Sequence, residues 1–149
     1  MSESPAAVNG SNDSATRDGD VTVDEQFPVR AEISRAMVRL YKEQFGRGPT
    51  KARTEFAGPD IVVCTLEDSF TPAERRLAEM GEHQRLRDTR LYFQHATKGE
   101  FLAVIERVLS RKVRAFNSSV DTHTDVSVEV FHLEPVPTES SNGHRPVRP

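Results

Sequence analysis

The segment Lys51-Ala-Arg-Thr-Glu-Phe-Ala-Gly-Pro-Asp-Ile-Val-Val-Cys-Thr-Leu66 decides the fold, because it predicts two strands joined by a tight turn. Over 51–57, small or apolar side chains alternate with charged ones, which is the pattern of a half-buried strand. Gly58-Pro59-Asp60 is typical of a turn. Residues 61–66 are apolar on both faces, so this strand is expected to be covered on both sides or to meet a partner.

Helices are predicted on both sides of this hairpin. Over 31–45, apolar side chains recur at spacings of three and four, and Gly46 ends the pattern. Thr71-Pro72-Ala73-Glu74 matches a capping box with proline at the first helical position, which predicts a helix from Pro72 to about Met80. Residues 82–110 fit one bent helix or two helices, and we favour a bend or break near Gly99.

A second hairpin closes the predicted domain. Residues 113–117 and 126–133 are expected to be strands, with the loop Asp121–Asp125 between them. The resulting order, αββααββ, predicts an α+β two-layer sandwich. We expect a four-stranded antiparallel sheet with the helices on one face.

The two ends of the chain differ from its middle. Residues 1–29 carry one basic and six acidic side chains, and residues 136–149 are rich in Pro and Ser, so both are expected to be disordered tails. The domain, 30–135, carries 17 basic and 16 acidic side chains, and this balance argues against nucleic-acid binding. We find no transmembrane segment and no secretory signal, so a cytoplasmic protein is expected.

Several short runs within this domain resemble one bacterial family in order and spacing. They are Phe45-Gly-Arg-Gly-Pro-Thr50, Ile61-Val-Val63, Leu66 to Glu74, Arg111-Lys-Val113, and Ser118, Asp121 and Asp125 ahead of Val130-Phe-His-Leu-Glu134. The family is MpsC, named after a sodium-translocating, membrane-potential-generating system, and the resemblance covers about 30–135. It implies a small cytosolic accessory protein that works beside membrane partners linked to ion movement and bicarbonate supply. It implies no catalytic residues.

The loop Gly46-Arg47-Gly48-Pro49 is the first candidate site. It follows a helix and faces its negative end, whereas phosphate-binding glycine loops precede a helix, so a C-cap and a forced exit at Pro49 are favoured. The alternative is that Arg47, with Lys51 and Arg53 on the adjoining strand, contacts an acidic partner or an anion.

Three further groups of residues were considered as sites. Asp121, His123 and Asp125 supply too few ligands for a metal, and Asp is favoured in a turn, so we expect Asp125 to cap or pin it. Cys64 is expected to be a buried, inert thiol. A third group, His83, Arg87, Arg90 and Gln94, is expected to be a solvated helix face, with a functional basic surface as the alternative.

Taken together, these patterns favour a protein that works by contact. No known signature of a catalytic, metal or cofactor site is present, so we expect no cofactor and no enzymatic activity. Apolar residues on both faces of the predicted strands indicate an exposed apolar surface, and we predict a homodimer or a permanent partner there. The leading hypothesis is an accessory or regulatory module for an ion- or bicarbonate-handling membrane system. The alternative is an anion or small-molecule sensor.

Overall fold

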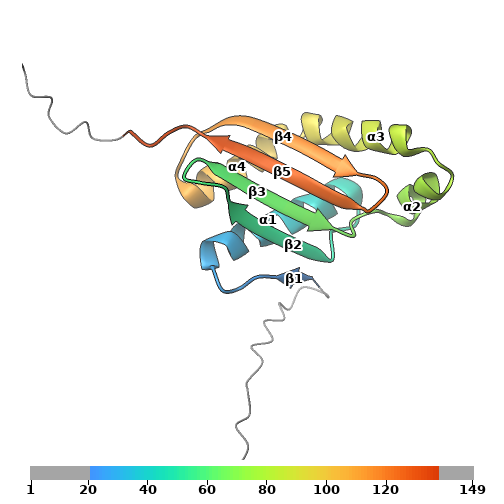
Figure 1. The fold of residues 1–149 in the computed structure, drawn as a ribbon, viewed down its shortest axis with the longest axis horizontal. Helices are drawn as coiled ribbons and strands as arrows, with labels where there is room; N and C mark the ends of the chain where they lie inside the picture. The colour runs from blue at the N-terminus through green and yellow to red at the C-terminus, as the bar shows by residue number, and fades with distance from the viewer. Residues whose placement is uncertain (1–20, 138–149) are drawn as a thin grey trace, which may run out of the picture.

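The predicted first hairpin lies in the middle of the sheet. The computed structural model describes residues 21–137, in which β2 (Lys51–Phe56) pairs antiparallel with β3 (Ile61–Glu67). β3 pairs antiparallel with β5 (Val126–Leu133), and β5 pairs antiparallel with β4 (Val113–Asp121) at the sheet edge. The strand order β1-β2-β3-β5-β4 therefore sets the two predicted hairpins side by side (Figure 1).

The described part of the chain contains a fifth strand, so the prediction of a four-stranded antiparallel sheet is wrong on this point. β1 (Thr22–Val23) pairs parallel with β2, with Thr22 opposite Lys51, which makes the sheet mixed. Two residues cannot show an alternating pattern, and their pairing partner is remote in sequence. β1 lies in the segment 1–29 that was expected to be a tail, and the same segment contains the first two residues of α1. Residues 1–20 and 138–149 lie outside the described residues.

The helix before the hairpin, α1 (Pro28–Phe45), begins slightly earlier than the apolar stripe predicted. Proline occupies its first turn, where the missing N–H costs no helical hydrogen bond. It ends at Gly46, whose φ of 79° is left-handed and whose N–H donates to the carbonyl of Lys42. This cap confirms the predicted helix end, because glycine adopts the left-handed conformation without strain.

The helices after the hairpin also begin and end close to the residues that the sequence predicted. α2 (Pro72–Glu79) starts with the predicted capping box: the Glu74 N–H donates to Thr71 Oγ1, and Glu74 Oε1 accepts from the Thr71 N–H. α3 (His83–Ala96) and α4 (Lys98–Leu109) are separate helices that meet at Thr97. The break near Gly99 is therefore confirmed.

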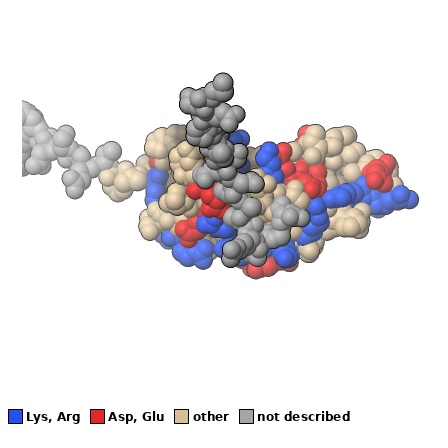
Figure 2. All heavy atoms as spheres, turned by 90° about the horizontal axis from the view of Figure 1, so that it is seen from below, with Lys and Arg blue, Asp and Glu red and all other residues tan. Residues whose placement is uncertain are grey.

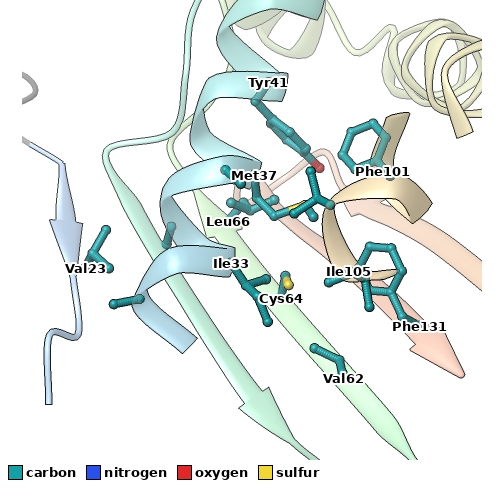
Figure 3. Close-up of a cluster of buried hydrophobic side chains, with 14 of the residues drawn as sticks. Val23, Ile33, Met37, Tyr41, Val62, Cys64, Leu66, Phe101, Ile105 and Phe131 are labelled. Atoms are coloured by element: carbon teal, nitrogen blue, oxygen red, sulfur yellow. The ribbon is translucent and has the colours of Figure 1, made fainter. Parts of the chain in front are cut away.

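The core lies between the sheet and a helix layer. α1 and α4 lie against one face of the sheet (Figure 1), and their side chains meet those of β3 and β5 in the core (Figure 3). Val62, Cys64 and Leu66 all point into this layer, so Ile61 and Val63 point away from it. The sequence had left open which of the two sets faces inward. The α+β class and its two layers are as predicted.

Candidate functional site

The loop between β3 and α2 is held by side chains from two distant turns. The carboxylate of Asp125 accepts hydrogen bonds from the backbone N–H groups of Ser69 and Phe70, both at 3.0 Å. The Arg47 guanidinium donates to the carbonyl oxygens of Asp68 and Phe70 and lies 3.3 Å from the Asp68 carboxylate. Three of the runs that carry the family resemblance therefore meet at this loop, which we call the β3–α2 loop.

Two residues in this region adopt left-handed backbone conformations. Asp68 has φ 57° and Asp125 has φ 55°, a conformation that aspartate tolerates better than most residues. Hydrogen bonds from Thr50 and Arg47, with the nearby charge of Arg75, outweigh the opposing effect of burial and lower the pKa of Asp68. The side chain of Asp125 therefore binds the β3–α2 loop, whereas the N–H groups inside the 121–125 turn donate to Asp121.

A buried arginine joins α3 to the capping box. Arg90 is 2% exposed, and its guanidinium Nη2 lies 2.7 Å from Glu74 Oε1, while Nε binds Oε2. It also donates to the carbonyl and hydroxyl of Ser69 and lies 3.8 Å from the ring centroid of Phe45. Burial would raise the pKa of Glu74, but the hydrogen bonds from Arg90 and Thr71 lower it. The expectation of a solvated face is wrong for Arg90 and Gln94, which are both buried.

A second buried acid lies on the core side of β5. Glu129 is fully buried, and its Oε1 accepts hydrogen bonds from the Tyr41 hydroxyl and the Gln94 amide. Its Oε2 has no hydrogen-bond partner among the described residues. Burial raises the pKa of Glu129 to about 7, against the opposing effect of the hydrogen bond from Tyr41. This carboxyl therefore titrates near neutral pH.

The structure places one of the three predicted contact residues, Arg47, apart from the other two. Arg47 is partly buried and tied to the β3–α2 loop, as described above. Lys51 and Arg53 are exposed on β2, where Lys51 pairs with Glu67 and Arg53 pairs with Glu55, both at 3.3 Å. The structure thus does not bring the three cations to one point.

The remaining predicted residues have structural partners. Asp121 accepts hydrogen bonds from the backbone N–H groups of His123 and Thr124, which lower its pKa. Gly48 lies close against α1, and Pro49 is buried. Burial raises the pKa of Cys64 to about 12, so its thiol stays protonated. Among residues 21–137, no group of three or more His, Cys, Asp or Glu could hold a metal ion.

The sheet face opposite the helices, called the outer face below, carries an apolar band along β3 and β5. Cross-strand partners share a face, and Val63 lies opposite Val130 while Thr65 lies opposite Val128. No helix of the described chain covers this face (Figure 1). The apolar side chains of the band are all partly exposed: Ile61, Val63, Val126, Val128 and Val130.

The outer face is bordered by polar side chains on both sides of the band. On β2 these are Lys51, Arg53 and Glu55, all exposed. On β4 they are small or acidic, and include Ser119 and Asp121. Seen from below, basic and acidic side chains are mixed over the surface of the molecule (Figure 2).

These features define a small α+β protein with a five-stranded sheet, a loop fixed by ion pairs and an open apolar sheet face. The chain belongs to the family described as "Na+-translocating membrane potential-generating system (MpsC)", whose family model matches residues 26–135. It is also similar to the uncharacterized protein YbcI of Bacillus subtilis (strain 168), with 24% identity over 106 residues, 70% of this chain and 85% of that protein. No solved structure matches the chain.

The family match confirms the resemblance found in the sequence. Within residues 21–137, none of the helices combines the length and apolar character needed to cross a membrane. Sequence reasoning missed Glu129, and it placed Arg90 on a solvated face although this side chain is buried. A signal for Glu129 was present, because strict alternation over 126–133 places residue 129 on the same face as Phe131 and Leu133.

Proposed function

We propose that this protein is a non-catalytic accessory protein that acts by binding other proteins through the outer face of its sheet. The observation that carries the proposal is the apolar band of β3 and β5, which no described helix covers. Contiguous exposed apolar surface with a polar border is typical of an interaction site. The buried thiol of Cys64, with a pKa of about 12, offers no nucleophile at neutral pH.

We propose that a second copy of the chain is one partner of this face. The four longer strands are about 4.8 Å apart and span about seven residues each, a footprint of about 450 Å² on each copy and about 900 Å² in total, which is the size of a weak, transient interface. A two-fold axis parallel to the strands would set β2 of one copy over β4 of the other. Lys51 would then lie near Asp121 of the second copy, because the two residues occupy one row across the sheet.

We also propose that the protein serves a membrane system that handles ions or bicarbonate. The family description names a sodium-translocating, membrane-potential-generating system, and this supports a membrane-protein partner. The β2 border of the outer face carries Lys51 and Arg53, whose exposed ion pairs with Glu67 and Glu55 can be exchanged for pairs with an acidic segment of such a partner.

Sedimentation of the full chain tests whether the outer face binds a second copy. We expect a concentration-dependent dimer for the wild type and a monomer for Val63→Glu, because a charge in the apolar band would have to be desolvated. Ala103→Glu, at an exposed position of α4, is the matched control and should still form the dimer. Circular dichroism should show that both variants are folded.

Binding to native membranes tests the membrane role. The wild-type chain should cosediment with membranes, and protease treatment of the membranes or Val63→Glu should remove the binding. A wild-type chain that stays monomeric at high concentration and binds no membrane would overturn the proposal. The proposal would also be overturned if Val63→Glu and the wild type had the same oligomeric state and bound membranes equally.

A further inference from the structure

A groove lies where α1 ends, away from the outer face. It has a volume of about 380 Å³, which is within the range of small-molecule sites. The last two turns of α1, the loop that leaves it and the residue before β1 form its walls. The lining residues are Val21, Val38, Arg39, Lys42, Gly46, Arg47, Gly48, Pro49 and Thr50.

The charged residues of this lining are all basic. Arg39 and Lys42 are exposed, and neither side chain forms an ion pair or hydrogen bond with another described residue. Arg47 is fixed by its hydrogen bonds to the β3–α2 loop, so its guanidinium is already ordered. Two unpaired cations thus lie beside a third whose position is set by the fold.

The uncharged part of the lining is largely apolar. Val21 and Val38 are partly exposed and contribute hydrocarbon surface, and the lining also includes the buried Pro49. The loop lies tight against the helix: a Cβ on Gly48 would meet the carbonyl oxygen of Val38 at 3.2 Å. An apolar wall beside basic side chains suits a ligand that has both an anionic group and an apolar body.

We propose that this groove binds an organic anion, with its phosphate group held by Arg39 and Lys42 beside Arg47. A guanidinium and an ammonium together bind a phosphate through several charge-assisted hydrogen bonds. The negative end of α1 lies nearby and opposes an anion, but its effect is equivalent to about half an elementary charge. The unpaired charges of Arg39 and Lys42 outweigh it. This proposal does not depend on the docking function proposed above.

Titration calorimetry on the full chain tests the site with adenosine 5′-monophosphate, inorganic phosphate and adenosine as probes. We expect saturable binding of adenosine 5′-monophosphate, weaker binding of inorganic phosphate and none of adenosine. Affinity should fall at least tenfold in the double variant Arg39→Gln and Lys42→Gln, whose substitutions lie at exposed positions. The control is Lys98→Gln with Arg107→Gln, which removes the same charge from exposed positions of α4 and should bind as the wild type does.

Vesicles separate a free phosphate ligand from a lipid headgroup. Binding to phosphatidylglycerol vesicles but not to phosphatidylcholine vesicles, lost in the Arg39 and Lys42 double variant alone, would assign the groove to a lipid phosphate. The proposal is wrong if neither the soluble probes nor the vesicles bind saturably. It is also wrong if the control double variant loses binding to the same extent.

Discussion

The buried carboxyl of Glu129 gives the most quantitative prediction, which is a loss of stability as the pH rises from about 4.5 to about 7. Burial raises its folded-state pKa from 4.5 to about 7. Below the unfolded-state pKa both states are protonated, and the fold carries no penalty. Between the two values the unfolded chain releases its proton first, so the free energy of unfolding falls. The shift corresponds to a loss of about 3 kcal/mol.

Glu129→Gln removes the titration and keeps the size of the side chain. The amide oxygen can still accept the hydrogen bond from Tyr41. We expect the variant and the wild type to have similar stability near pH 4.5. Above pH 7 the variant should be more stable by about 3 kcal/mol. Urea denaturation at half-unit steps from pH 4.5 to 8.5 measures this difference directly.

Glu43→Gln is the matched control for this experiment. Glu43 is an exposed carboxylate on α1, so the same substitution there tests whether the pH-dependent difference belongs to the buried position of Glu129. The reasoning is refuted if the stability difference between Glu129→Gln and the wild type is the same at pH 5 and pH 8. A variant that is less stable than the wild type at pH 8 would refute it as well.

Three further predictions concern the loop and the glycines. Arg90→Gln should lower the free energy of unfolding by about 3 kcal/mol because it leaves Glu74 largely buried without its partner; the loss, measured in urea, should be partly recovered by adding Glu74→Gln. Asp125→Ala should cost about 2 kcal/mol and Asp125→Asn less, since the alanine leaves two loop N–H groups unpaired; thermal unfolding that ranks them otherwise would contradict this. Gly99→Ala should stabilise by about 0.5 kcal/mol because its Cβ meets open space in α4, whereas Gly48→Ala should destabilise by about 1 kcal/mol; equal melting temperatures would count against both.

Local signals predicted most of the fold. The capping box of Thr71 and Glu74 and the left-handed cap at Gly46 each depend on a few adjacent residues, so they can be predicted from the sequence. The alternation over β2 also predicted which of its side chains are exposed. β1 could not be predicted, because its two residues form a strand only through pairing with β2.

The buried polar groups were harder to predict than the elements that carry them. Arg90 follows Leu86 by four residues, so both lie on the buried face of α3, but an arginine on a helix is usually solvated. Its burial depends on Glu74 and Ser69, which come from other parts of the chain. Arg47 was predicted to be a contact residue. Its hydrogen bonds to the carbonyl oxygens of Asp68 and Phe70 could not be predicted, because these residues also come from another part of the chain.

The most direct test of protein binding at the outer face is the rate at which a thiol placed on this face reacts with maleimide. Val130→Cys puts one reactive thiol in the apolar band, while native Cys64 is buried and stays unreactive. The maleimide labelling rate of Val130→Cys should fall as the protein concentration rises, and the rate of Ala103→Cys on α4 should stay constant. Identical rates for Val130→Cys from nanomolar to high micromolar protein, with and without native membranes, would contradict the account.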